Sequence, residues 1–246
     1  MDLVIGTLAL RPYVFAFLVF FLVAATVDLG WRRTLGFGGC VWSVAWISEF
    51  SSTRTGVPFG QYQYTGLTRG RELYIADVPF VDALSFTFLA YAAFCLARAA
   101  LAGREPSTWT LALATGVLMM ALDVVIDPLA VRGDRWFLGR LFSYSTPGIY
   151  FGVPLSNFIG WIVVGAVGVG LYLFLVPGGL GQRVWPGVAL YYGVLGFNLA
   201  VTMWIDEWLM AGMGATLHVA IVLAIWRIQR TLMTESIPGN QGARRA

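Results

Sequence analysis

The segment 109–128 constrains the fold of this chain more than any other. It reads WTLALATGVLMMALDVVIDP and carries no charge before Asp123 and Asp127. An apolar run of about 20 residues is long enough to cross the hydrocarbon core of a bilayer as a helix, and in the bilayer only helices and closed barrels satisfy their backbone groups. The segment therefore predicts a membrane-spanning helix with two carboxylates near its end.

Similar apolar runs recur along the 246 residues, of which 58% are hydrophobic and 12% charged. The runs predict seven membrane-spanning helices, at about residues 12–27, 35–50, 79–100, 109–128, 154–176, 185–205 and 209–228. The predicted fold class is all-α, a polytopic membrane helical bundle. We expect one transmembrane domain, residues 1–232, and a disordered polar tail, 233–246. Gly165, Gly168 and Gly170 predict that the fifth span packs closely on a neighbour.

The basic residues of this chain are all arginine, since the sequence contains no lysine. A retinal Schiff base requires a lysine amine, so a rhodopsin-like photoreceptor is excluded. Cys40 and Cys95 fall inside predicted apolar helices and are interpreted as small hydrophobic residues. The single histidine, His218, is interpreted as a hydrogen-bonded packing residue. We therefore expect no metal or other cofactor, and no nucleic-acid partner.

Asp123 and Asp127 are four residues apart, so they share one face of a helix, about one turn from each other. Because Pro128 disfavours helical geometry at the residue before it, we expect the helix to end at Asp127. Asp123 would then lie about 6 Å deeper. An ionisable side chain inside a membrane is costly and is a functional candidate by default. The alternative is a carboxylate that caps a helix end or pairs with a loop arginine.

Successive spans cross the membrane in alternate directions, and this alternation predicts where the polar residues gather. The polar residues near span ends fall on one side of the membrane: Glu49, Asp82, Asp123, Asp127, Asn157, Asp206 and Glu207. The two long aromatic loops, 51–78 and 129–152, fall on the same side and could cover the cluster. Asp28 falls on the opposite side. We therefore expect a pocket of carboxylates under an aromatic lid.

Crowded carboxylates in a partly dry pocket cannot all remain ionised, so at least one keeps its proton at neutral pH. A protonated acid beside an ionised one is suited to electrophilic chemistry on an alkene. The acid protonates a carbon–carbon double bond, aromatic faces stabilise the carbocation, and the ionised partner orients water or removes a proton. A substrate dissolved in the bilayer could enter between the helices.

Three segments also carry a resemblance to a known family. Residues 49–65 (EFSSTRTGVPFGQYQYT), 121–128 (ALDVVIDP) and 150–161 (YFGVPLSNFIGW) resemble the bacterial and archaeal carotenoid hydratases. The similarity covers roughly residues 46–161. Members of this family add water to the terminal double bond of an acyclic carotenoid end group. The resemblance implies a multi-pass protein of a prokaryotic inner membrane. Its partners would be the lipid bilayer and a membrane-dissolved carotenoid or isoprenoid, and its oligomeric state is left open.

The resemblance also implies roles for four residues. Asp123 is expected to donate the proton because it lies deeper, and Asp127 is expected to tune the acidity of Asp123. Glu49 is expected to position water, and Asn157 to hydrogen-bond one of these acids. The predicted substrate-binding residues are Arg54, Tyr62, Tyr64, Asp82, Trp161 and Asp206.

Several of these residues keep an alternative interpretation. Arg54 is expected to pair either with Glu49 or with a lipid phosphate. Tyr62 and Tyr64 either stabilise a cation or anchor the loop at the membrane interface. Asp206 either contributes to the site or simply ends a helix. Asp82 departs from the plainly apolar helix start that the family is expected to show.

Three other functions could use the same features. In carotenoid cyclisation, a dry pocket would let a neighbouring double bond capture the cation. An intramembrane prenyltransferase would use Asp-x-x-x-Asp to hold Mg²⁺ and a diphosphate, although only one such motif occurs. A lipid or ion carrier could use intramembrane carboxylates for proton coupling, although the acids here gather on one side.

Overall fold

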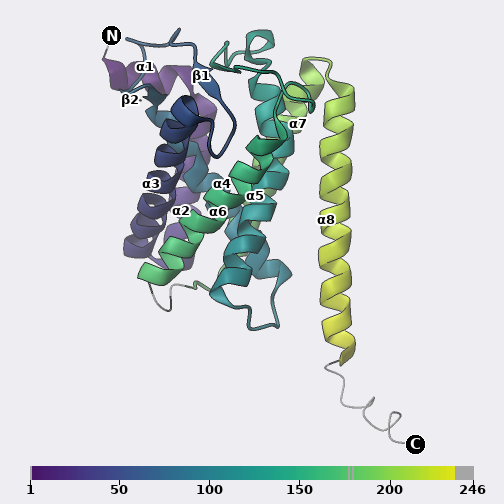
Figure 1. Ribbon diagram of the computed structural model, residues 1–246. Coiled ribbons are helices and arrows are strands. Elements are labelled where there is room, and N and C mark those ends of the chain that lie inside the picture. Colours follow the sequence, from purple (N-terminus) through teal and green to yellow (C-terminus); the bar gives the residue numbers. More distant parts are fainter. Residues whose placement is uncertain (1, 177, 179, 236–246) are drawn as a thin grey trace, which may run out of the picture.

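The computed structural model describes residues 2–176, 178 and 180–235, which form a helical bundle (Figure 1). The all-α fold class is confirmed. The elements in chain order are α1 (Leu3–Leu10), α2 (Pro12–Leu29), α3 (Trp31–Thr55), β1 (Tyr62–Tyr64), β2 (Tyr74–Ile75), β3 (Val78–Pro79), α4 (Phe80–Ala100), α5 (Thr108–Ala130), the 3-10 turn η1 (Gly133–Arg135), β4 (Phe142–Tyr144), α6 (Leu155–Leu175), α7 (Trp185–Trp204) and α8 (Trp208–Glu235).

Six of these helices are long and apolar enough to cross a membrane: α2, α4, α5, α6, α7 and α8. Helix α3 takes the place of the second predicted span. It is 25 residues long, but glycine, serine and charged residues, Glu49 among them, make it less apolar than the others. The predicted polar tail begins inside the last turn of α8, and its residues 236–246 lie outside the described part of the chain.

Helix α4 is the centre of the bundle, and most of its side chains are buried against α2, α3, α5 and α7. Helices α5 and α6 meet backbone to backbone. A Cβ on Gly116 would lie 2.3 Å from the carbonyl oxygen of Ile162, and one on Gly165 would lie 2.9 Å from the Cα of Gly116. A Cβ on Gly168 would lie 3.3 Å from the Cα of Val41 in α3, which is also tight. A Cβ on Gly170 would lie 3.8 Å from the Cβ of Ala112, an ordinary contact. The predicted close packing of the fifth span is therefore confirmed at Gly165 and Gly168.

Helix α5 does not end where the sequence predicted. It begins after Ser107, whose hydroxyl caps the helix by accepting from the backbone N–H of Thr110 at 3.1 Å, and it continues through Pro128 to Ala130. The prediction of an end at Asp127 was wrong. Pro128 lies in the last turn, where it removes one helical hydrogen bond at little cost, and the N–H of Val131 still bonds the carbonyl of Asp127.

The two long loops pair with each other at one end of the bundle, the upper end in Figure 1. Strands β1 and β4 run antiparallel, with Tyr62 opposite Tyr144 and Tyr64 opposite Phe142. Strands β2 and β3 form a second short antiparallel pair within the first loop. Helix α1 lies at the same end. The pairing of β1 with β4 therefore joins the loops into one cover.

Asp28 lies at the opposite end of the bundle, as the alternation predicted. Its carboxylate accepts from Arg98 at 2.6 Å, from the Tyr91 hydroxyl at 3.3 Å and from the backbone N–H of Arg183 at 2.7 Å. These bonds tie α2, α4 and the connection between α6 and α7 together. Since its oxygens are satisfied within the protein, Asp28 acts as a structural anchor.

Candidate active site

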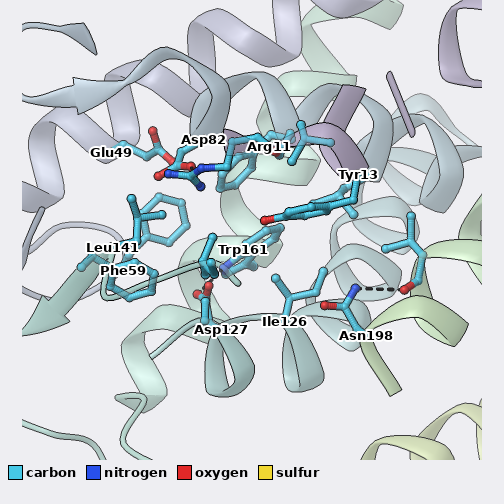
Figure 2. Close-up of a pocket in the computed structure, with 18 of the residues that line it drawn as sticks. Arg11, Tyr13, Glu49, Phe59, Asp82, Ile126, Asp127, Leu141, Trp161 and Asn198 are labelled. Carbon is cyan, nitrogen blue, oxygen red and sulfur yellow. Dashed lines mark hydrogen bonds and ion pairs between the residues drawn. The ribbon is translucent and has the colours of Figure 1, made fainter. Parts of the chain in front are cut away.

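A cavity of about 150 Å³ lies at the end of the bundle that the paired loops cover. Its walls come from six helices, α2 to α7, and from strands β1 and β4 (Figure 2). Aromatic and aliphatic side chains form most of the lining. Among them the cavity holds three carboxylates from three different helices: Glu49 of α3, Asp82 of α4 and Asp127 of α5. The structure therefore brings together acids that are far apart in sequence.

One wall of the cavity is built by α5 and α6. The Asn157 side-chain amide donates to Asp123 Oδ2 and to Asp127 Oδ2, at 2.7 Å each. The Trp161 indole N–H also donates to Asp127 Oδ2, at 3.1 Å. The hydrogen bond expected of Asn157 is therefore present, and it is made to both aspartates. Trp161 in turn stacks on Phe86, with ring centroids 4.4 Å apart.

The two aspartates of α5 differ in their access to the cavity. Asp127 lines it, whereas Asp123 is fully buried behind Asp127 and Asn157 and does not line it. The second oxygen of Asp123, Oδ1, has no hydrogen-bond partner among the described residues. Helix rotation as well as depth decides which acid lines the cavity, and here that acid is Asp127.

The facing wall carries Glu49, Asp82 and Arg11, which lie close together in Figure 2. The guanidinium of Arg11 bonds Asp82 at 3.3 Å and Glu72 at 3.1 Å. Glu72 is fully buried in the loop before β2 and does not line the cavity. Glu49 is buried, and its Oε2 has no hydrogen-bond partner in the described part of the chain. The wall therefore holds one ion-paired carboxylate and one carboxyl without a cation.

The cover over the cavity is aromatic. Tyr62 lies against Tyr64 and Phe142, with ring centroids 5.5 and 5.6 Å apart, and against Tyr144 at 5.9 Å. Burial raises the pKa of Tyr62 and of Tyr64 above the ordinary value of a phenol. Burial and then Asp127 do the same for Tyr144. These phenols therefore stay protonated and face the cavity as neutral hydrogen-bond donors.

Two predicted substrate-binding residues do not line the cavity. Arg54 is ion-paired with Asp77 at 3.0 Å on the exposed surface and lies over the Phe50 ring, so the expected pairing with Glu49 is absent. Arg54 sits one turn beyond Glu49 and points outward, where Asp77 of the β2–β3 turn reaches it. Asp206 is exposed at the turn between α7 and α8. The next residue, Glu207, pairs with Arg132 and Arg135 instead of facing the cavity.

Sequence reasoning missed Arg11 and Tyr13, which both line the cavity. Arg11 directly precedes the first predicted span, and the same alternation that gathered the acids places it on their side. Tyr13 stacks on Phe197 of α7 with ring centroids 5.1 Å apart, and no spacing in the sequence signals that contact. The sequence did contain one signal for Arg11. It is a basic residue that directly precedes an apolar run and is followed by proline.

Within the described ranges, no group of three or more His, Cys, Asp or Glu side chains is placed to hold a metal ion. His218 is buried and hydrogen-bonded to the Tyr191 hydroxyl at 3.2 Å and to the Gly214 carbonyl at 2.9 Å, as expected of a packing residue. Cys40 and Cys95 are free thiols.

Comparison with known proteins connects the chain with carotenoid biosynthesis. A family model described as "Carotenoid biosynthesis protein" matches residues 4–221. The bisanhydrobacterioruberin hydratase of Haloarcula japonica is 34% identical over 179 residues, which are 69% of this chain and 57% of that relative. The match thus spans little more than half the length of the relative. No solved structure matches the chain. Because the family match extends over every helix that lines the cavity, we conclude that the chain belongs to the carotenoid biosynthesis protein family.

Proposed function

We propose that this protein adds water to the terminal double bond of an acyclic carotenoid, giving a tertiary alcohol. One observation carries the proposal: an aromatic cavity, in a member of a carotenoid biosynthesis family, has carboxyl groups on two facing walls. Hydration needs an acid that protonates the double bond from one side and a group that positions the attacking water on the other. The named hydratase relative supports the same reaction class.

The acid is assigned to Asp127, because it faces the cavity and Asp123 does not. This reverses the roles that depth along the helix suggested. The two carboxyl groups share the amide of Asn157, and no described cation contacts either of them. Two carboxylates this close in a water-poor site hold one proton between them. Asp123 would keep that proton available to Asp127, which delivers it to the alkene carbon.

The cation that forms would be stabilised by the rings that line the cavity. Trp161 and Phe86 stack beside Asp127, and the Tyr62 and Tyr64 rings cover the space above it. A cation over an aromatic face gains about 0.5–2 kcal/mol per ring, most where water is excluded. Glu49, on the facing wall, would position the water molecule that attacks the cation.

The size of the cavity favours the end of a chain as the part of the substrate that is bound. A cavity of about 150 Å³ is comparable to one that accommodates a benzene molecule. It takes a branched end group of a few carbons, while the rest of a long polyene must extend beyond it. A substrate dissolved in the bilayer fits this arrangement, and we place the protein in a prokaryotic inner membrane.

The proposal is tested by expressing the chain in a host that accumulates the acyclic carotenoid lycopene, followed by chromatography and mass spectrometry. The wild type is expected to convert the pigment into products heavier by the mass of water. Asp127→Asn is expected to abolish conversion, and Asp77→Asn, an exposed carboxylate on the same side, to leave it intact. Products isomeric with lycopene would show cyclisation instead, and activity lost on chelation would favour the prenyltransferase alternative.

A further inference from the structure

The cavity has an unequal distribution of charge. Three carboxyl side chains line it, and Arg11 is the one basic side chain that lines it among the described residues. Arg11 is itself buried, with 3% of its side chain exposed, so solvent screens its charge weakly. The guanidinium contacts Asp82 and Glu72 but neither Glu49 nor Asp127. A single buried cation therefore selects which acid of the cavity remains charged.

Arg11 is held in place by the elements around it. It ends α1 and begins the turn into α2, and its backbone N–H bonds the Thr7 carbonyl at 3.2 Å. The Thr7 hydroxyl accepts from the backbone N–H of Leu73 at 3.0 Å, which docks the loop that carries Glu72. Of the two acids that contact Arg11, only Asp82 faces the cavity. The effect of Arg11 on a ligand therefore passes through Asp82.

We propose that Asp82, kept as a carboxylate by Arg11, is the base that takes the proton from the water attacking the cation. Arg11 is then a positioning residue that decides whether the cation is captured by water or returns to an alkene. This inference rests on the proposed hydration. It also accounts for Asp82, which interrupts an otherwise apolar helix start.

The proton balance closes with the groups at the site. The π electrons of the terminal double bond form a new C–H bond with the proton from Asp127, leaving a tertiary cation. A lone pair of the water oxygen then forms the C–O bond, and the O–H bond that breaks gives its proton to Asp82. A protonated alcohol is a strong acid, so an ion-paired carboxylate is basic enough to accept its proton. Transfer of that proton back to Asp127 through solvent completes the cycle, and alkene plus water gives alcohol.

Glu49 is the competing candidate for the base. It is buried, one of its oxygens is unpartnered among the described residues, and no described cation contacts it. It also lies beside Asp82 (Figure 2), and two adjacent carboxylates in a dry site do not both ionise. With Arg11 on Asp82, the charge belongs on Asp82, and Glu49 is left as a neutral group that hydrogen-bonds the water.

The test follows two readouts in membranes supplied with the acyclic carotenoid in deuterated water: the yield of alcohol, and deuterium in the recovered substrate. Deuterium enters the substrate when protonation occurs and the cation then loses a proton instead of capturing water. Asp82→Asn is expected to lower the yield of alcohol by about 10²-fold or more, the usual size of a general-base effect, while deuterium exchange persists. Arg11→Gln is expected to show the same loss of alcohol with retained exchange as Asp82→Asn. Arg11→Lys is expected to recover part of the alcohol yield that Arg11→Gln loses.

Two variants serve as controls. Asp127→Asn is expected to lose both alcohol and exchange, and Asp77→Asn, whose carboxylate is exposed and paired with Arg54 and Arg69, to match the wild type. The inference is overturned if Asp82→Asn hydrates like the wild type, or if it loses exchange as completely as hydration. A wild type that neither hydrates nor exchanges would instead refute the proposed function, and this inference with it.

Discussion

At the scale of single residues, one amide group holds the acid pair together. Asn157 donates at 2.7 Å to both aspartates of α5, and Trp161 adds a second bond to Asp127. A buried carboxylate without its donors carries a desolvation penalty. Asn157 therefore fixes the position of Asp127 relative to Asp123, and in the proposed reaction it would also set how the two share a proton.

Replacing Asn157 by leucine tests this role. The change keeps the size of the side chain, leaves Asp123 Oδ2 without its hydrogen-bond donor and leaves Asp127 Oδ2 with Trp161 as its remaining side-chain donor. We therefore expect a loss of about 1–3 kcal/mol in stability and a fall in hydration rate of roughly 10²-fold. Thermal unfolding in detergent and product analysis measure the two effects. Thr202→Val, which removes a buried hydroxyl bonded within its own helix, is expected to keep its activity. Equal activity of Asn157→Leu and Thr202→Val would contradict the role.

Two arginines show that the direction of a charged side chain could not be predicted from the sequence. Spacing alone made Arg54 a plausible partner for Glu49, yet its side chain points outward to Asp77. Arg11, which directly precedes an apolar run, is the cation that enters the site. Sequence assigns a charged residue to a side of the membrane. Its inward or outward direction depends on side-chain packing around the helix, which spacing does not encode.

At the scale of elements, the contact of α5 with α6 aligns the acid with its donors. Asp123 and Asp127 come from α5, and Asn157 and Trp161 come from α6. Gly116 of α5 lets the two backbones touch. Any separation of these helices would lengthen the hydrogen bonds to both aspartates at once.

Gly116→Ala is expected to destabilise the protein and lower its activity together. The added Cβ would lie 2.3 Å from the Ile162 carbonyl oxygen, and overpacking of this kind costs about 1–3 kcal/mol, which exceeds the gain of about 1 kcal/mol in helix propensity. Gly193→Ala on α7, where nothing lies within 4 Å, is the matched control and should be neutral or slightly stabilising. Thermal unfolding in detergent compares the two. A Gly116→Ala variant as stable as the control would show that the contact is looser than described.

The elements themselves were predictable to different degrees. Apolar runs predicted the long helices because a bilayer imposes their length. The end of α5 was placed too early, since a proline in a last turn costs little. The pairing of β1 with β4 had no signal in the sequence. These strands are three residues long and lie in separate loops, and only the folded bundle brings the loops together.

At the scale of the whole molecule, alternation of the spans explains why one end of the bundle is polar. Helix ends from distant parts of the chain meet there, and the loops that must connect them on that side form the aromatic cover. The Asp28 anchor lies at the other end. The gathering of acids could therefore be predicted from sequence. The choice of Asp127 over Asp123 could not, because helix rotation depends on packing.

The central claim is that the acids gathered at this end of the bundle catalyse the addition of water to a carbon–carbon double bond. Its most direct test is to supply the acyclic carotenoid to membranes containing the protein, in water enriched in heavy oxygen, and to measure the mass of the product. The account predicts an alcohol that carries the heavy oxygen, formed by the wild type and not by Asp127→Asn. A product isomeric with the substrate, or an alcohol with ordinary oxygen, would contradict it.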